Sequence, residues 1–292
     1  SFDFTGAGVA LITPFKKNFD IDFDALGKLV DYQVAGGMDY LVALGTTAET
    51  ATLSDEEKNE IVAYIKERTD GKIPLIVGMG GNNTRAMIKK MESFDSTGVS
   101  GFLIVTPYYN KPNQEGLFRH YMELAAHTPL PIVLYNVPSR TGINMEAETV
   151  IRLAEASDKF VAVKEASGNL TQITRIAKNT PPHFKVISGD DVMAITIMSV
   201  GGKGIISVIA NALPAKVSRL IGHGLKGDFT EARKIHYELI ELFILQFQDG
   251  NPAGVKTMLS HFGVIENVLR LPLIPANEVT QKMIIQELQK LA

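Results

Sequence analysis

Cysteine and tryptophan are both absent from this chain of 292 residues. Without cysteine the chain cannot form disulfides, a cysteine-ligated zinc or iron–sulfur site, or a cysteine nucleophile. An excess of charge is lacking as well, because 29 Lys and Arg residues stand against 32 Asp and Glu residues, for a formal net charge of −3. A near-neutral chain offers no basic surface for nucleic acid or for an anionic membrane. We therefore expect no nucleic-acid partner and no membrane partner.

Long apolar runs are also missing. The most apolar stretch, residues 192–215, is interrupted by three glycines, Asn211 and Pro214, whereas a transmembrane helix needs about 20 consecutive apolar residues. Residues 1–6 are too few and too polar for the apolar core of an export signal. The six histidines form no close pair that would suit a metal ion. These features predict a soluble, cytoplasmic protein without a metal site.

Eight short runs rich in Val, Ile and Leu recur at the spacing of strand–helix units. They are residues 9–12, 40–44, 73–77, 101–105, 131–135, 160–164, 184–187 and 204–208. Continuous apolar runs are typical of parallel strands that are covered on both faces. Helical spacing follows each run, as after Ser54, where the order Ser-Asp-Glu-Glu is typical of a capping box. We therefore predict an α/β fold, a closed (β/α)8 TIM barrel over residues 1–226, with a doubly wound open sheet as the alternative.

The remainder of the chain contains no run that resembles a strand. Apolar residues at helical spacing predict helices over residues 229–247, 252–262 and 278–291. We therefore predict a small helical C-terminal domain over residues 227–292, packed on the barrel.

Polar side chains gather where five of the predicted strands end. In a barrel of this type, catalytic residues lie at the C-terminal ends of the strands. The segments that follow these strands carry hydroxyls, tyrosines, an arginine and a lysine, in residues 45–50, 106–110, 135–142, 164–168 and 188–191. We therefore expect one active site at this rim of the barrel.

Lys164 is the most informative of these residues. It directly follows Val-Ala-Val at residues 161–163, and strand alternation places Phe160, Ala162 and Lys164 on one face. If this face is the barrel interior, burial lowers the pKa of the lysine, and a neutral amine forms Schiff bases with carbonyl compounds. The alternative, a solvated lysine at a strand end, is disfavoured by the polar residues at the other strand ends.

Three further features fit such chemistry. Tyr135 ends an apolar run, so we expect a buried ring and a hydroxyl that relays protons, although a core tyrosine with a satisfied hydroxyl shows the same pattern. Gly-Thr-Thr at residues 45–47 precedes a helix, and backbone N–H groups there suit a carboxylate or phosphate, unless the segment is a plain turn. Arg140 lies in a turn, where a guanidinium either matches a substrate carboxylate or is an ordinary surface arginine.

Taken together, the strand-end segments resemble the dihydrodipicolinate synthase family, within the wider N-acetylneuraminate lyase superfamily. The resembling residues are 45–49 (GTTAE), 106–110 (TPYYN), 135–142 (YNVPSRTG), 164–170 (KEASGNL) and 188–191 (SGDD). They occur in the order and spacing of the family, and the resemblance runs nearly end to end. The motifs of Lys164 and Tyr135 are shared across the superfamily, whereas Arg140 within Pro-Ser-Arg-Thr-Gly is more specific to the synthase branch.

The resemblance implies an enzyme that condenses pyruvate with L-aspartate 4-semialdehyde to 4-hydroxy-tetrahydrodipicolinate, in lysine and diaminopimelate biosynthesis. It implies that Lys164 forms an imine with pyruvate. It also implies that Tyr135, Thr46 and Tyr109 relay protons, with Tyr109 reaching into the site of a neighbouring subunit. Because the imine turns the methyl group of pyruvate into an enamine nucleophile, no metal and no organic cofactor is expected. Family members are usually homotetramers, and a dimer would be the smallest active unit.

The resemblance also assigns the substrate-binding positions. Thr46 and Thr47 would hold the carboxylate of pyruvate, and Arg140 would hold the carboxylate of the semialdehyde. Gly189 and Ile206 would shape the pocket through backbone groups. One departure is Ala48, where the family usually has glycine, and its methyl group would strain the turn if the backbone there had a positive φ.

A second departure concerns feedback inhibition. In lysine-inhibited relatives the effector lies at a subunit interface, and the matching positions here are Thr50, Ala51, Asp55, Lys58, Asn82, Ala86 and Tyr108. Strongly inhibited forms have glutamate at the position of Ala86, and it holds the ammonium group of the effector. Ala86 offers no carboxylate and Lys58 repels a cation, so we expect weak inhibition or none.

Two alternatives remain from the sequence. A sister class I aldolase, such as an N-acetylneuraminate or keto-deoxy-sugar acid lyase, would keep Lys164 and Tyr135 but would not need Arg140. A non-catalytic barrel that binds keto acids would bind pyruvate without turnover.

Overall fold

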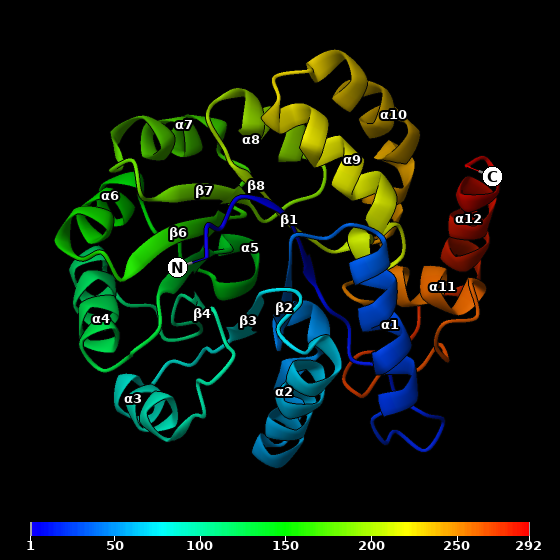
Figure 1. Ribbon diagram of the computed structural model, residues 1–292, viewed down its shortest axis with the longest axis horizontal. Helices are drawn as coiled ribbons and strands as arrows, with labels where there is room; N and C mark the ends of the chain where they lie inside the picture. The colour runs from blue at the N-terminus through cyan, green and yellow to red at the C-terminus, as the bar shows by residue number, and fades with distance from the viewer. Residues whose placement is uncertain (1, 292) are drawn as a thin grey trace.

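The computed structural model describes residues 2–291, and within them the chain forms a closed barrel of eight parallel strands surrounded by helices (Figure 1). The strands are β1 (Gly6–Ala10), β2 (Tyr40–Ala43), β3 (Leu75–Gly78), β4 (Gly101–Val105), β5 (Ile132–Asn136), β6 (Phe160–Glu165), β7 (Lys185–Ser188) and β8 (Gly204–Ser207). Each strand pairs in parallel with the next, and β8 pairs with β1. The predicted (β/α)8 barrel is confirmed, and the open sheet is wrong.

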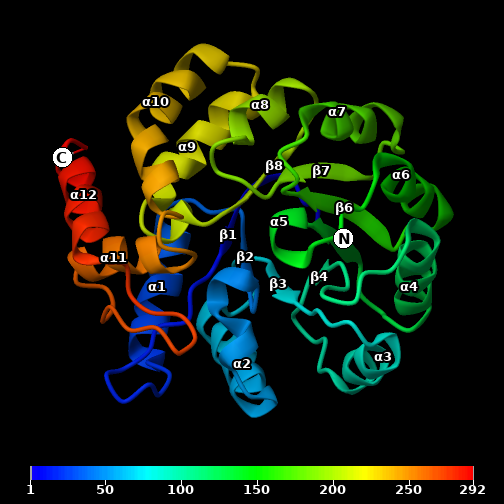
Figure 2. The same cartoon turned by 180° about the vertical axis from the view of Figure 1, so that it is seen from behind.

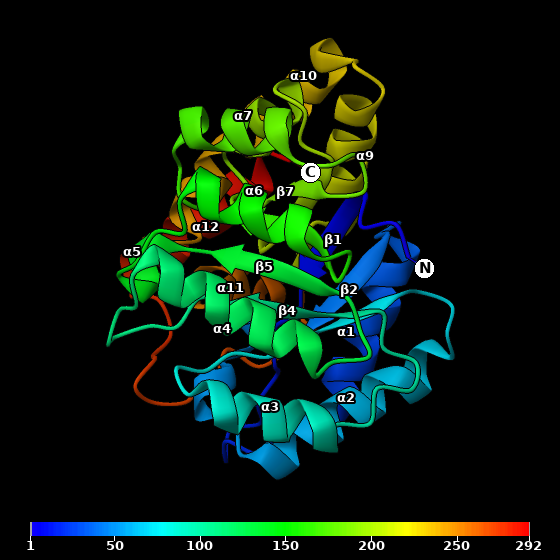
Figure 3. The same ribbon diagram turned by 90° about the vertical axis from the view of Figure 1, so that its left-hand side faces the viewer.

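Helices follow the strands in the expected alternation. They are α1 (Phe23–Ala35), α2 (Asp55–Thr69), α3 (Thr84–Ser93), α4 (Gln114–Ala126), α5 (Pro138–Thr141), α6 (Ala147–Ala156), α7 (Leu170–Asn179), α8 (Ala194–Ser199), α9 (Pro214–Leu225), α10 (Phe229–Leu245), α11 (Ala253–His261) and α12 (Glu278–Gln289). Short 3₁₀ helices are η1 (Thr46–Ala48), η2 (Thr50–Thr52) and η3 (Ile209–Asn211). A view from the side places α5 and the N-terminus at opposite ends of the barrel (Figure 3).

Local side-chain contacts set where several helices begin. Ser54 and Glu57 form the predicted capping box of α2, in which each side chain accepts a hydrogen bond from the other residue's backbone N–H. Asn113 and Asn169 cap α4 and α7 through their side-chain oxygens. Pro214 is the first residue of α9, where its missing N–H costs nothing.

The first strand lies earlier than the sequence predicts. It comprises Gly6–Ala10 rather than residues 9–12. The prediction began too late because Gly-Ala-Gly at residues 6–8 has a composition that is typical of a turn. A β-carbon on Gly8 would lie only 2.2 Å from Cε2 of the Tyr40 ring on β2. Glycine therefore leaves the space that this buried ring occupies, and the hydroxyl of Tyr40 donates to the carbonyl of Ile205 at 3.2 Å.

The sixth strand contains an irregularity that overturns one expectation about its faces. Phe160 pairs with Ile132, but Ala162 pairs with the next residue of β5, which leaves Val161 as an extra residue. Phe160 therefore packs between the barrel and the helices, whereas Ala162 packs in the barrel interior. The predicted common face of Phe160, Ala162 and Lys164 is wrong for Phe160, because an extra residue reverses the alternation of side chains.

Two apolar layers hold the fold together. The inner layer fills the barrel and contains Phe4, Ala10, Tyr40, Val42, Ile76, Leu103, Val133, Tyr135, Val137, Ala162, Ile187 and Ile206. The outer layer lies between strands and helices and continues into α10, α11 and α12 through buried residues such as Leu239, Val255 and Ile284. Of these helices, α10 packs on α9 and α12, and α11 packs on α12, at the right of Figure 1.

The predicted boundary at residues 226 and 227 falls in the turn between α9 and α10. Because the outer apolar layer continues across this turn, the division into two domains stays a prediction. Within residues 2–291, no helix is both long enough and apolar enough to span a bilayer. The cytoplasmic location expected from the sequence also stays a prediction.

Candidate active site

Lys164 and Tyr135 lie side by side on neighbouring strands. The register pairs Tyr135 of β5 with Lys164 of β6, and only 5% of the lysine surface and 6% of the tyrosine surface are exposed. The Nζ atom of Lys164 lies 4.2 Å from the centroid of the Tyr135 ring. Both residues stand near the C-terminal ends of their strands, the end of the barrel at which α5 lies (Figure 2). The structure thus brings a buried amine and a buried phenol together.

Gly189 lies beside this pair, and Ile206 lies in the barrel interior. Gly189 directly follows β7, and its backbone N–H donates to the carbonyl of Glu165 at 2.9 Å. A β-carbon built on Gly189 would lie 3.1 Å from Cγ of Lys164, so the two residues are in contact. Ile206 on β8 is 1% exposed and belongs to the same inner layer as Tyr135. Gly189 therefore borders the amine, whereas the role of Ile206 in the pocket stays a prediction.

The turn after β2 carries the two threonines that are expected to hold a carboxylate. Thr47 is buried and Thr46 is half-buried, both within η1. Two residues of the turn have a positive φ, Leu44 at 57° and Glu49 at 56°. Ala48 lies within η1 and has no positive φ. The methyl group of Ala48, where the family usually has glycine, therefore causes no backbone strain.

Residues of the C-terminal helical region hold this turn, and the sequence did not point to them. Nδ2 of Asn251 donates to Oγ1 of Thr47 at 2.9 Å, and both side chains are buried. Nζ of Lys256 donates to Oε2 of Glu49 at 2.6 Å, and neither side chain is exposed. A lysine on a predicted helix is normally assigned to the solvent face of that helix. The partner of Lys256, Glu49, lies 207 positions away in the chain. No local signal could therefore have revealed this ion pair.

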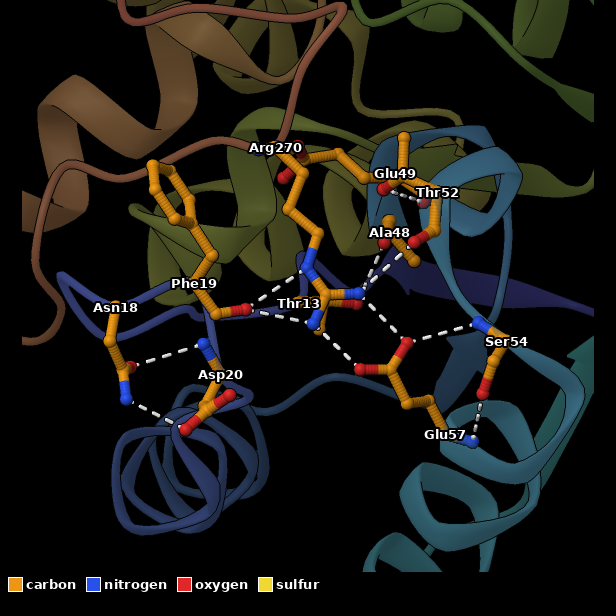
Figure 4. A network of polar contacts seen from close by, with 10 residues as sticks. All are labelled: Thr13, Asn18, Phe19, Asp20, Ala48, Glu49, Thr52, Ser54, Glu57 and Arg270. Atoms are coloured by element: carbon orange, nitrogen blue, oxygen red, sulfur yellow. Dashed lines mark hydrogen bonds and ion pairs between the residues drawn. The ribbon is translucent and has the colours of Figure 1, made fainter.

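Arg270 adds a second set of contacts to the same turn (Figure 4). Its backbone N–H donates to Oε1 of Glu49 at 3.0 Å. Its guanidinium donates to both carboxylate oxygens of Glu57, at 2.8 and 2.6 Å, and to the carbonyls of Thr52 and Phe19. This contact holds the pKa of the Glu57 carboxyl below its usual value. The loop that contains Arg270 therefore joins η2, the start of α2 and the loop before α1.

A buried polar network lies directly behind the amine and the phenol. Nδ2 of Asn136 donates to Oε1 of Glu165 at 3.1 Å, and the backbone N–H of Met145 donates to Oδ1 of Asn136 at 2.9 Å. Gln172 of α7 donates to Oε2 of Glu165 at 3.3 Å. Burial raises the pKa of the Glu165 carboxyl, and the hydrogen bonds to its carboxylate oppose this rise. The signal for this network was present, since Asn136 and Glu165 each follow a proposed catalytic residue and so point to the opposite face of the strand.

Asp190 and Asp191 follow β7 and act as local hydrogen-bond acceptors. Oδ1 of Asp190 accepts from the backbone N–H of Val192 at 3.0 Å. Asp191 is buried and accepts from the side chains of Ser207 and Gln246. Burial raises the pKa of both carboxyls. Within residues 2–291 no three His, Asp or Glu side chains are grouped to hold a metal ion.

Arg140 and Tyr109 are exposed, unlike the buried Lys164 and Tyr135. Arg140 lies on α5 and is exposed. Tyr109 has φ 70° and is 89% exposed, which is unusual for a large aromatic residue. Among the described residues, no hydrogen bond joins Tyr109 to Tyr135 or Thr46. Thr46 and Tyr135 share no hydrogen bond within residues 2–291 either, so the expected proton relay stays a prediction.

The positions that match the effector site of lysine-inhibited relatives lie around the start of α2 and α3. They are Thr50, Ala51, Asp55, Lys58, Asn82, Ala86 and Tyr108, and all are exposed or half-buried. The carboxylate of Asp55 pairs with Lys90 at 2.8 Å and with Lys58 at 3.5 Å. These ammonium groups, Lys90 first, lower the pKa of Asp55. Lys90, one turn after Ala86 on α3, thus adds a cation to this region that the sequence did not indicate.

The comparison with known proteins identifies the family. Residues 3–291 match the family model described as "Dihydrodipicolinate synthetase family". The chain belongs to this family. A 4-hydroxy-tetrahydrodipicolinate synthase of Parabacteroides distasonis is 54% identical over 287 residues, which are 98% of this chain and 97% of that protein. A protein of the same name from Phocaeicola vulgatus is 54% identical over 275 residues, 94% of this chain and 93% of that protein.

The fold places the chain in the same family. The crystal structure of dihydrodipicolinate synthase from Thermotoga maritima matches with a TM-score of 0.96 and 40% identity, over 99% of both chains. The resemblance inferred from the strand-end motifs is therefore confirmed. These relatives favour the synthase branch of the superfamily over a sister aldolase or a non-catalytic barrel.

Proposed function

We propose that this chain is an enzyme that condenses pyruvate with L-aspartate 4-semialdehyde to 4-hydroxy-tetrahydrodipicolinate. The observation that supports this most directly is the buried pair of Lys164 and Tyr135, which lie 4.2 Å apart from Nζ to ring centroid in a member of the dihydrodipicolinate synthetase family. The names of the relatives supply the reaction. In this proposal the amine of Lys164 forms the imine and the hydroxyl of Tyr135 transfers protons.

The reaction begins with the amine of Lys164 and the keto group of pyruvate. A carbon–nitrogen bond forms and water leaves, with Tyr135 delivering a proton to the departing oxygen. Loss of a proton from the methyl carbon then gives an enamine, whose carbon attacks the aldehyde carbon of the semialdehyde. The amino group of the semialdehyde displaces the lysine amine from the imine carbon and closes the ring. One water is released overall, and Lys164 returns to its starting state.

The turn after β2 and the helix after β5 supply the carboxylate contacts of this proposal. Thr46 and Thr47 would hold the pyruvate carboxylate at the start of η1, through hydroxyl and backbone N–H groups. Arg140 would hold the semialdehyde carboxylate from α5, since a guanidinium can donate two parallel hydrogen bonds to a carboxylate. Gly189 and Ile206 would shape the pocket around the keto acid.

Tyr109 would complete the relay in a second copy of the chain. Its exposed ring and left-handed backbone suit a residue that projects into a neighbouring subunit. A homodimer is then the smallest unit with a complete site. The tetramer that is usual in the family remains a proposal for this chain.

Borohydride reduction in the presence of pyruvate tests the central step. Reduction traps the imine as a stable secondary amine, and peptide mass mapping then locates it. We expect one adduct for each chain, on the peptide that contains Lys164, and none with the Lys164→Ala variant. An adduct on another lysine, or no adduct at saturating pyruvate, would overturn the proposed site.

An Arg140→Met substitution separates the synthase from a sister aldolase. Loss of the guanidinium should raise the KM for the semialdehyde by about 10- to 100-fold, since a charged hydrogen-bonded contact contributes roughly 1.5–3 kcal/mol. The pyruvate adduct on Lys164 should still form at the wild-type rate. Wild-type cleavage of N-acetylneuraminate without semialdehyde condensation would favour the sister enzyme.

A further inference from the structure

Glu49 lies at the centre of the turn that carries Thr46 and Thr47. Its backbone is left-handed, with φ 56° and ψ 36°, a conformation that L residues adopt only when the surrounding structure holds it. Its side chain points inward and is 0% exposed. Glu49 therefore connects the carboxylate-binding turn to the interior of the protein.

Lys256 of α11 holds the carboxylate of Glu49. Its Nζ lies 2.6 Å from Oε2 of Glu49, donates a second hydrogen bond to the carbonyl of Val268 at 2.8 Å, and lies 4.4 Å from the centroid of the Phe15 ring. The remaining charged group that faces this ammonium is Arg270. Burial lowers the pKa of Lys256 to about 8, and the charge of Glu49 opposes this effect. The ammonium therefore has fixed partners on several sides and no contact with solvent.

Asn251 makes a parallel contact from the same C-terminal segment. Its side-chain N–H donates to Oγ1 of Thr47 at 2.9 Å. Because this oxygen accepts from Asn251, the hydrogen of the Thr47 hydroxyl points elsewhere and is free to donate to a carboxylate. Asn251 thus contacts Thr47, and Lys256 contacts Glu49.

We propose that Lys256 is a positioning residue, which holds the Thr46–Thr47 turn in the geometry that binds the carboxylate of the keto acid. This inference rests on the proposed function, in which these threonines contact pyruvate. Lys256 does not touch substrate and acts through Glu49. Loss of the ion pair lets the turn move relative to Lys164. Binding of the semialdehyde should be affected much less, since Arg140 lies on α5 after a different strand.

Steady-state kinetics of Lys256→Met, Glu49→Gln and the double variant test this role. All three should raise the KM for pyruvate by about tenfold, because a displacement of about 1 Å can cost that much or more. The KM for the semialdehyde should change by less than about twofold. Each single variant leaves one buried charge without its partner and should lower the unfolding midpoint, whereas the double variant should recover much of this loss. If the ion pair served only stability, the double variant would regain both its stability and the wild-type KM for pyruvate. A KM for pyruvate that stays raised in the double variant therefore supports the positioning role.

Two further variants complete the experiment. Ile284→Val removes one buried methyl group from α12 and lowers stability without touching the turn, so its pyruvate KM should match the wild type. Glu49→Asp keeps the charge but withdraws the carboxylate from Lys256, and it should raise the pyruvate KM to an intermediate value. If one of the other variants fails to fold, Glu49→Asp still tests the role of Lys256.

The inference and the proposed function fail in different ways. A wild-type pyruvate KM in the double variant and in Glu49→Asp, or an equal rise in Ile284→Val, would overturn the role of Lys256. In that case the wild-type protein still forms the borohydride-trapped adduct on Lys164. Absence of the adduct in the wild-type protein overturns the proposed function itself.

Discussion

Gly189 packs against the aliphatic chain of Lys164. A β-carbon built on Gly189 would lie 3.1 Å from Cγ and 3.2 Å from Cε of the lysine, and 2.9 Å from the β-carbon of Ala166. Favourable contacts between carbon atoms are about 3.5–4.0 Å. The missing side chain at Gly189 therefore leaves the space through which Lys164 reaches the interior of the barrel.

The Gly189→Ala substitution should displace the amine of Lys164. Because Gly189 has no positive φ, we expect the variant to fold, with kcat reduced by about 100-fold through misplacement of the amine. The measurement is kcat together with the rate of borohydride trapping with pyruvate. Gly222→Ala on α9 is the matched control, since no atom lies within 4 Å of its new β-carbon. Wild-type trapping by Gly189→Ala would contradict the prediction.

Tyr135→Phe should separate proton transfer from packing. The ring remains buried beside Lys164, but the hydroxyl is lost, so kcat should fall by about 100- to 10,000-fold with little change in the KM values. Tyr121→Phe is the control, because that hydroxyl donates to the carbonyl of Ile104, a contact outside the proposed site. The control should lose about 1 kcal/mol of stability and keep its activity. A kcat within about twofold of the wild type for Tyr135→Phe would exclude this tyrosine as the proton relay.

L-Lysine should inhibit this enzyme weakly or not at all. The exposed Ala86 provides no carboxylate, and the carboxylate of Asp55 is already paired with Lys90 and Lys58. An incoming ammonium group would therefore meet two cations. Activity measured across the millimolar range of L-lysine should stay constant. Ala86→Glu, which restores the carboxylate expected in inhibited relatives, should make inhibition measurable, and strong inhibition of the wild type at low concentration would refute the prediction.

Burial of His120 predicts that stability falls with acidification. Its Nδ1 lies 2.8 Å from Oγ1 of Thr84, the side chain is 7% exposed, and burial lowers its pKa to about 4. The unfolded chain takes up a proton near pH 6.5, whereas the folded chain does not until about pH 4. The contribution of neutral His120 to the free energy of unfolding is therefore fully present above pH 6.5. It falls by about 3 kcal/mol as the pH decreases from 6.5 to 4.

Urea unfolding at pH 7 and at pH 4.5 measures this slope. His120→Gln removes the titrating group and should make the difference between the two pH values smaller. The exposed His261→Gln substitution should leave the difference as it is in the wild type. An equal slope in His120→Gln and the wild type would assign the acid sensitivity to other groups.

Much of the fold and of the proposed site could be predicted from the chain. Continuous apolar runs at regular spacing predicted the barrel, because strands covered on both faces need apolar residues at every position. The positions of Lys164 and Tyr135 followed from the barrel, since the C-terminal ends of all its strands meet at one rim. The strand-end motifs were sufficient to indicate the family, and the family model confirmed it.

Other features depend on contacts between residues that are distant in the chain. The extra residue Val161 is visible only in the pairing of β5 with β6, and it turned Phe160 away from the barrel interior. Gly8 pairs with Tyr40 of β2, and its missing side chain leaves the space that the Tyr40 ring occupies.

Local patterns of apolar and polar residues thus account for the architecture and for the residues at its catalytic rim, because each strand and its end lie within one short segment. The ion pair of Glu49 with Lys256 has no such local origin. It forms because closure of the barrel and packing of α11 bring together two charges that are 207 positions apart in the chain. Burial then makes each charge depend on the other, a physical requirement that arises only in the folded protein.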